Sequence, residues 1–167
     1  MAGFAALQPA LTAQLTFNAP VSIGHINSGS QLFIALINGG TLKSEPGFTP
    51  TVNAKFEFGT DHFKVTNDMK YCTLDVKAAL TNADGATISY TYTGHIEITP
   101  EFAAVMTGAA EAKTVDFGLV FTHVTFETGA SHLKVLETGR FVGTSRFIVE
   151  EGKPQVIEMK ISKLVKG

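Results

Sequence analysis

The sequence predicts an all-β protein: an antiparallel β-barrel of about eight to ten strands with one short helix near residues 100–108. Three observations support this. Most segments are short runs rich in Phe, Val, Ile and Thr, bounded by Gly, Pro or Asn. Several alternate apolar and polar residues, which is typical of half-buried antiparallel strands. Only one segment has helical spacing. Closure of the sheet is expected because it removes exposed edges.

The strands are expected in sequence order, most of them joined by hairpin turns. In the last one, Ile157, Met159 and Ile161 alternate with polar residues, so one face is buried. The loop Thr81–Gly85 contains residues that tolerate positive φ and joins two strands into a hairpin. The expected strands are 14–17, 31–37, 51–58, 71–80, 86–93, 117–126, 134–136, 140–150 and 156–165.

The helix is predicted from its first residues. Thr99 is suited to the N-cap, and Pro100 to the first helical position. Phe102, Val105 and Met106 then follow at i, i+3 and i+4, which gives one apolar stripe. The stripe either docks on the barrel or plugs one end of it, and core packing is its more ordinary role.

Composition limits the class of protein. A chain of 167 residues, 44% of them hydrophobic, is expected to form a single domain over residues 1–167 with a full core. The net charge of -2 offers no basic field to nucleic acid or anionic lipid. No signal peptide is indicated, and no apolar run approaches the roughly 18 residues of a membrane span. We therefore expect a cytoplasmic protein without nucleic-acid or membrane partners.

The usual catalytic and metal-binding motifs are absent. The sequence contains no phosphate loop, no Gly-x-Gly-x-x-Gly, no Gly-x-Ser-x-Gly and no His-Glu-x-x-His. A single cysteine, Cys72, excludes an internal disulfide and is expected to be a buried, inert thiol. The histidines never occur as His-x-His, so no metal and no cofactor are expected. They are His25, His62, His95, His123 and His132.

Two charged residues on one predicted strand are the first candidates for a site. Asp75 and Lys77 are two residues apart and therefore share a face of the strand. If that face lines the barrel, Asp75 would be the general base and Lys77 would neutralise developing negative charge. If the other face packs inward instead, the pair is merely solvated.

The neighbouring strand supplies two tyrosines. Tyr90 and Tyr92 share a face and combine an apolar ring with a hydroxyl donor, which suits an aromatic or polyketide-like ligand. Ordinary cross-strand packing is the alternative. Because the loop at residues 81–85 makes the two strands adjacent, both pairs could meet across the ladder.

Four further residues complete the expected site. Phe121 and His123 continue an apolar face; Phe121 is a candidate ligand contact and His123 either a catalytic group or a hydrogen-bonded rim residue. Asp61 and His62 are expected at the rim of the cavity. As adjacent residues of one strand they point to opposite faces, which argues against a direct Asp–His pair.

Several short pieces, most of which contain glycine, occur in a characteristic order. They are Asn38–Thr41, Gly59–His62, Leu74–Lys77, Asn82–Ala86, Phe126–Ala130 and Arg140–Gly143. Over roughly residues 15 to 165 this set resembles the DUF3237 family of small β-barrel proteins of unknown function, with Asn38–Thr41 matching an early double-glycine turn. The resemblance implies the fold and leaves the function open. Lys77, Ala78, Val135 and Glu137 depart from the family's usual residues, so a pocket lined by them would differ from the common one.

Two functions from different classes fit these observations. We favour a cofactor-independent enzyme, of isomerase, cyclase or lyase type, acting on a small organic molecule that is aromatic or polyketide- or terpenoid-like. The alternatives are a non-catalytic carrier of a small ligand and an oligomeric structural barrel; a homo-oligomer is compatible with any of the three. An enzyme pocket should hold an ionisable group with a strongly perturbed pKa, whereas a carrier pocket can be apolar throughout.

Overall fold

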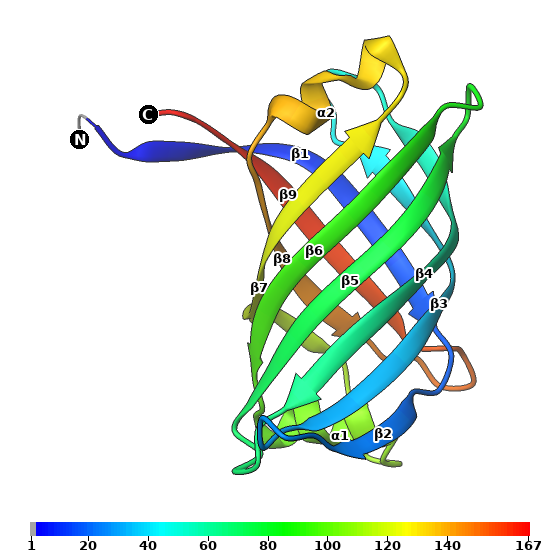
Figure 1. Cartoon of the computed structure of the whole chain (residues 1–167), viewed down its shortest axis with the longest axis vertical. Coiled ribbons are helices and arrows are strands. Elements are labelled where there is room, and N and C mark those ends of the chain that lie inside the picture. Colours follow the sequence, from blue (N-terminus) through cyan, green and yellow to red (C-terminus); the bar gives the residue numbers. More distant parts are fainter. Residues whose placement is uncertain (1–2) are drawn as a thin grey trace.

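The computed structural model describes residues 3–167 and confirms the predicted antiparallel barrel (Figure 1). One strand lies outside the closed ring, and the described helices are short. The strands are β1 (Ala5–Phe17), β2 (Val21–His25), β3 (Gln31–Ser44), β4 (Asn53–Val65), β5 (Tyr71–Asn82), β6 (Thr87–Glu97), β7 (Val115–Thr128), β8 (Phe141–Ile148) and β9 (Val156–Lys166). The helices are α1 (Pro100–Thr107), α2 (Val135–Thr138) and the 3-10 turn η1 (Ser131–Leu133).

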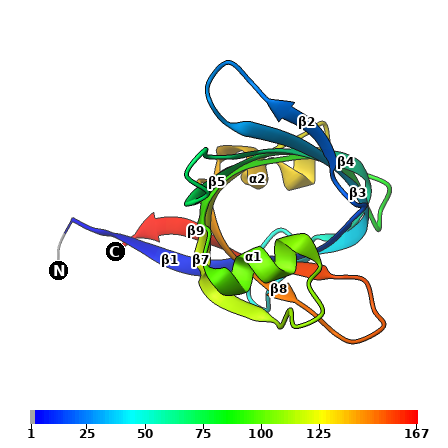
Figure 2. The same ribbon diagram turned by 90° about the horizontal axis from the view of Figure 1, so that it is seen from below.

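Strand β1 closes the barrel. The strands pair in the order β1-β9-β8-β7-β6-β5-β4-β3, and β1 also pairs with β3, so the ring has no free ends. Strand β2, which the sequence did not predict, pairs with the first part of β3 and lies outside the ring (Figure 2). The first residues of β1 pair with the end of β9 and form a ribbon that projects from the barrel (Figure 1).

The double glycine of Asn38–Thr41 lies inside strand β3, so the expectation of a turn there is wrong. In the ladder, Gly40 is opposite Leu15 of β1. Its φ is 143°, and a Cβ atom built there would lie 2.2 Å from the carbonyl oxygen of Gln14. The glycine therefore permits the close backbone approach that closes the ring.

Helix α1 forms where the sequence predicted it. The Thr99 hydroxyl accepts a hydrogen bond from the Phe102 amide at 3.3 Å, and Gly108 ends the helix in the left-handed conformation. Phe102 and Val105 are buried, while Met106 is 36% exposed. The helix lies across one end of the barrel (Figure 2). No helix in residues 3–167 is long and apolar enough to span a membrane.

Residues 134–136, predicted as a strand, belong instead to a helical turn at the opposite end of the barrel (Figure 1). Leu133 and Leu136 are buried there, at helical rather than alternating spacing. The Lys134 ammonium donates to the Thr128 carbonyl oxygen and to Glu137, which ties the turn to the end of β7. η1 and α2 thus plug the end that α1 does not cover.

The half of the barrel next to α2 is solid. Aromatic rings pack edge to face across its interior: Phe56 against Tyr90 at 5.4 Å between centroids, and Phe126 against Phe141 at 5.2 Å. Tyr90 is fully buried among them. In the half next to α1, a second, smaller apolar cluster surrounds a cavity.

Candidate functional site

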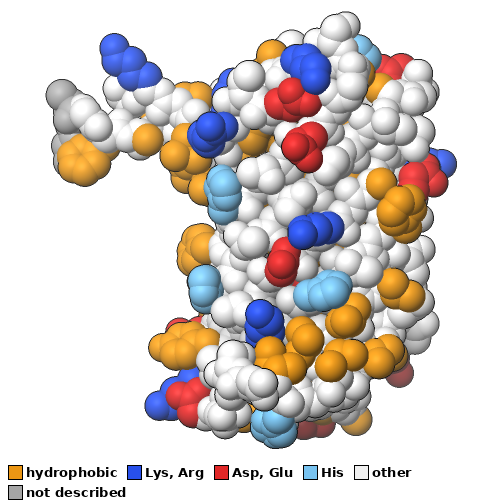
Figure 3. Space-filling view, viewed as in Figure 1, with side chains coloured by type: hydrophobic (Ala, Val, Ile, Leu, Met, Phe, Trp, Pro, Cys, Tyr) orange, Lys and Arg blue, Asp and Glu red, His pale blue; other side chains and the backbone are white. Residues whose placement is uncertain are grey.

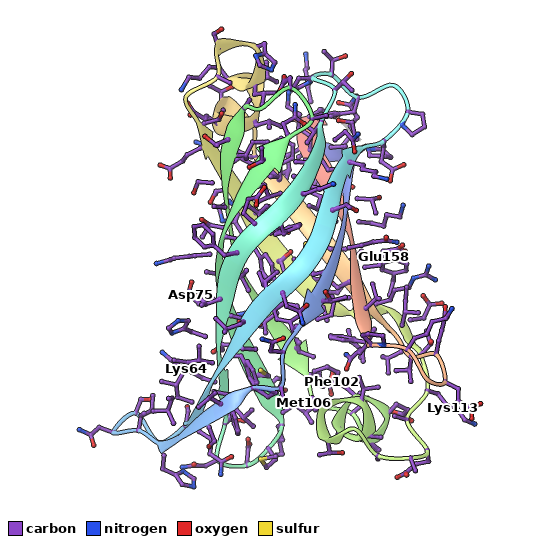
Figure 4. All side chains as sticks on the ribbon, turned by 90° about the vertical axis from the view of Figure 1, so that its right-hand side faces the viewer. Lys64, Asp75, Phe102, Met106, Lys113 and Glu158 are labelled. Carbon is purple, nitrogen blue, oxygen red and sulfur yellow. The ribbon has the colours of Figure 1, made fainter. Side chains whose placement is uncertain are left out.

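The cavity has a volume of about 420 Å³ and lies in the half of the barrel that faces α1. Its walls are inward-facing side chains of the strands, and Phe102 and Met106 of α1 lie at its mouth (Figure 4). Phe33 and Phe63 also line it, stacked with their ring centroids 5.1 Å apart. The volume falls within the range of small-molecule sites.

Polar side chains interrupt this apolar lining at a few points. Asp61 of β4, Cys72 of β5, Tyr92 of β6 and Ser145 of β8 all line the cavity. Asp61 is opposite Val76 in the ladder, and Val76 is opposite Tyr92, so Asp61 and Tyr92 share one row across three strands. An apolar pocket with a few convergent polar groups is the usual form of a ligand or active site.

Asp61 is the most unusual group in the cavity. It is only 7% exposed, and its Oδ1 atom has no hydrogen-bond partner. Burial raises the pKa of its carboxyl to about 7, with a smaller increase from the negative charge of Asp75 and a partial opposing effect from the Asp75 backbone. Near neutral pH the Asp61 carboxyl therefore exists in both protonation states, as a general acid or base requires.

The neighbouring groups stay protonated. Burial raises the pKa of Tyr92 well above its usual value, and the charge of Asp61 adds to this increase. Burial likewise raises the pKa of Cys72 to about 12, again with a contribution from Asp61. The Tyr92 hydroxyl can therefore act as a hydrogen-bond donor, while the Cys72 thiol matches the buried, inert thiol expected from the sequence.

Asp75 and Lys77 do not line the cavity, so the expectation that they would converge with the tyrosines is wrong. Both are exposed on the outer face of β5, and Asp75 points away from the barrel (Figure 4). The apolar residues between and beside them, such as Val76 and Ala78, occupy the inner face. Asp75 and Lys77 border only a small outer depression of about 80 Å³, together with Thr60 and His62.

Phe121, His123 and His62 also lie on the outside. All three are exposed, Phe121 to 66%, because the inward positions of β7 are taken by Val120 and Val124. Charged and histidine side chains are visible across this outer wall in the space-filling view (Figure 3). The expected placement of these three residues at the ligand is therefore wrong as well.

The two tyrosines face inward as predicted, but only one reaches the cavity. Tyr92 lines it, whereas Tyr90 lies in the solid half, where its hydroxyl donates to the Met159 Sδ at 3.3 Å. Asp61 was expected at the rim and instead lies in the wall. The alternation of side chains along the strand therefore predicted that Tyr92 faces the cavity. It could not show how far the aromatic packing of the solid half extends along the barrel.

Ser145 was not predicted from the sequence as a site residue. It is 1% exposed and lies on the inner face of β8 with Phe141, Gly143 and Phe147. A single serine in an otherwise apolar period-two face is the signal that could have found it. Asp61 stands out in β4 in the same way, between Gly59 and Phe63.

The geometry defines a class of protein: a small closed β-barrel in which one half of the interior is packed with side chains and the other half holds a mostly apolar cavity. The chain belongs to the DUF3237 family, described as proteins of unknown function, whose sequence profile matches residues 5–164. The resemblance seen in the sequence is thus confirmed. No curated protein sequence matches the chain.

Solved structures share the fold. A conserved protein of unknown function from Rhodopseudomonas palustris is 20% identical with a TM-score of 0.76, covering 98% of this chain and 99% of that one. A β-barrel-like protein from Acinetobacter baumannii is 18% identical with a TM-score of 0.73, covering 99% of each chain. An enzyme from Penicillium herquei is 14% identical with a TM-score of 0.65, covering 99% of this chain and 98% of that one. At these identities the likeness concerns the fold alone.

Proposed function

We propose that this protein is a cofactor-independent enzyme, of isomerase, cyclase or lyase type, that acts on a small and largely apolar organic molecule in the cavity. The observation that carries the proposal is Asp61, a buried carboxyl in an apolar cavity with its pKa raised to about 7. Perturbed ionisable groups in clefts are typical of catalytic sites.

Proton transfer by Asp61 is the central step of the proposed mechanism. The ionised carboxylate takes a proton from a C–H or O–H group of the substrate, and the protonated carboxyl returns a proton at another atom. The net reaction then rearranges bonds without an external reactant. General acid–base catalysis of this kind contributes about 10²- to 10⁴-fold in rate.

The other cavity residues support that step. The Tyr92 hydroxyl shares a row with Asp61 and is a donor that can stabilise negative charge developing on the substrate. Aromatic side chains such as Phe33, Phe63 and Phe102 limit access of water and restrict the substrate to few conformations.

A non-catalytic carrier is the second candidate, and the mostly apolar walls favour it. A carrier has no need for a buried carboxyl that changes protonation near neutral pH. The neighbour from Penicillium herquei, which is described as an enzyme, supports the enzyme by fold analogy.

Replacing Asp61 by Asn should abolish most of the turnover. Purified protein would be incubated with neutral aromatic, polyketide-like and terpenoid-like compounds, and products of unchanged mass or with a small molecule eliminated would be sought by mass spectrometry. On a compound that the wild type converts, Asp61→Asn should lower kcat by roughly 10²-fold or more. Asp75→Asn, which removes an exposed carboxylate from the adjacent strand, should change it by less than about twofold. Equal turnover in all three proteins would refute the proposed role of Asp61.

The same reaction should depend on pH. If Asp61 acts as the base in the free enzyme, kcat/KM of the wild type rises with pH and levels off above about 7, because the carboxylate form becomes complete there. A profile without an inflection between pH 6 and pH 8, measured on a step limited by chemistry, would exclude Asp61 as that base.

A further inference from the structure

Two buried oxygen atoms of the cavity wall have no hydrogen-bond partner. They are Asp61 Oδ1 and Ser145 Oγ. Asp61 is 7% exposed and Ser145 only 1%. Across residues 3–167, one other buried side-chain oxygen is in this state, Thr144 Oγ1, which belongs to the outer face of β8.

The two oxygen atoms come from opposite walls. Between β4, which carries Asp61, and β8, which carries Ser145, the ring runs through β5, β6 and β7 on one side and through β3, β1 and β9 on the other. Both side chains point inward. Asp61 and Ser145 therefore face the lumen from opposite sides of the ring of strands.

Burial of a polar atom without a partner is costly, and native proteins keep few such atoms. Neither of these two atoms bonds to a neighbouring strand; the backbone hydrogen bond that the Asp61 carboxyl receives from Asp75 does not involve Oδ1. Rotation about the Cα–Cβ bond would turn each oxygen toward a ligand in the cavity, which would then supply the missing hydrogen bonds. Ligand sites commonly place a few polar groups in this way to fix orientation.

We propose that the cavity holds an uncharged molecule with an apolar body and a hydrogen-bonding group at each end, one end bound by Asp61 and the other by Ser145. This rests on the proposed function, because it names the substrate class of the same site. Ser145 fixes the orientation of the substrate relative to Asp61, so that one defined end undergoes proton transfer.

The volume of the cavity and the charge of its lining restrict the class of ligand further. At the roughly 30 Å³ that one water-sized group occupies in a liquid, a cavity of about 420 Å³ takes on the order of 14 non-hydrogen atoms. Among residues 3–167, those that line the cavity include no Lys, Arg or His, so a carboxylate or phosphate ligand would find no opposite charge there. The expected ligands are thus two-ring diols and similar neutral compounds.

Matched phenols test the inference by binding alone. The probes are para,para′-biphenol and para-phenylphenol, which differ by one terminal hydroxyl, and hydroquinone and phenol as a shorter pair. Isothermal titration would give the affinity gained from the second hydroxyl. In the wild type, at least one diol should bind about tenfold more tightly than its mono-phenol, as expected for one additional hydrogen bond in a buried site.

Ser145→Ala should remove this gain and leave the affinity of the mono-phenol unchanged. Thr144→Ala is the matched control, since it removes the adjacent hydroxyl on the outer face. It should leave the gain intact. The melting temperature of Ser145→Ala should be unchanged or higher, because the deleted hydroxyl bonds to no protein group.

Three results would overturn the inference: no gain in the wild type for either pair, a gain that persists in Ser145→Ala, or a lower melting temperature for that variant, which would show that the hydroxyl serves the fold. Each is independent of turnover. Failure of Asp61→Asn to change catalysis would refute the proposed function while leaving the two-ended binding mode in place.

Discussion

Asp61→Asn is expected to stabilise the protein at alkaline pH. The Asp61 carboxyl has a folded-state pKa of about 7, against about 3.9 in an unfolded chain. Between those values the folded state binds more protons than the unfolded state, so the unfolding free energy of the wild type falls as pH rises from about 4 to about 7. At about 1.4 kcal/mol for each unit of pKa difference, the loss is roughly 4 kcal/mol. The Asp61→Asn variant has no titrating carboxyl at this position, so it does not lose this unfolding free energy.

Urea unfolding of both proteins at several pH values between 5 and 8 measures the effect. The difference in unfolding free energy should grow with pH and level off near pH 8. All other titrating groups are common to both proteins and cancel in the difference. Asp75→Asn should show no comparable trend, because Asp75 is exposed. A difference between wild type and Asp61→Asn that is constant with pH would mean that Asp61 is ionised throughout.

This gain in stability should accompany a loss of turnover. A buried carboxyl that costs stability when charged is retained only where something else requires it, and catalysis is the requirement that we propose. An asparagine variant that is both more stable at pH 8 and far less active would show the two effects in one residue.

Gly40→Ala is expected to lower the unfolding free energy by about 4 kcal/mol. The added Cβ would lie 2.2 Å from the carbonyl oxygen of Gln14, a backbone atom of strand β1 that cannot rotate away. The φ of 143° also strains any residue with a side chain. Overpacking and backbone strain each cost about 1 to 3 kcal/mol. Both act at the seam where β1 closes onto β3.

Gly39→Ala is the control for this substitution. Its Cβ would meet only the Thr16 hydroxyl, at 3.3 Å, and its backbone does not lie in the left-handed region. We expect a change of less than about 1 kcal/mol. Thermal or urea unfolding compares the two variants. Similar stability of Gly40→Ala and Gly39→Ala would show that the β1–β3 seam can move apart at no cost.

The sequence predicted the fold well where local patterns decide it. Period-two alternation located most strands, and the Thr99–Pro100 cap located α1, because both patterns depend on neighbours in the chain. It failed where distant contacts decide. Residues 134–136 have strand-like composition, yet Leu133 and Leu136 plug the barrel end from a helical turn. The closing role of Gly40 depends on β1, which is far away in sequence.

The site was predicted less well, for a related reason. The alternation of side chains along each strand showed which residues share a face, but not which face points into the barrel. For β5 the charged pair Asp75 and Lys77 suggested a lumen, whereas the apolar residues Val76 and Ala78 occupy it. Asp61 and Ser145 each stand out as a polar residue on an otherwise apolar face, but this pattern becomes informative only once the inner face of β4 and β8 is known from the closed ring of strands.

The division of the barrel into a solid and a hollow half has a consequence for how such proteins diversify. The aromatic contacts among Phe56, Tyr90 and Phe126 hold one half, and Tyr92 is a cavity residue that also packs on it, with its ring centroid 5.7 Å from that of Tyr90. Cavity side chains that do not contact this solid half can therefore change, and ligand preference with them, at small expense to folding. A scaffold of this kind suits laboratory evolution, in which randomised libraries should be confined to the wall positions next to α1.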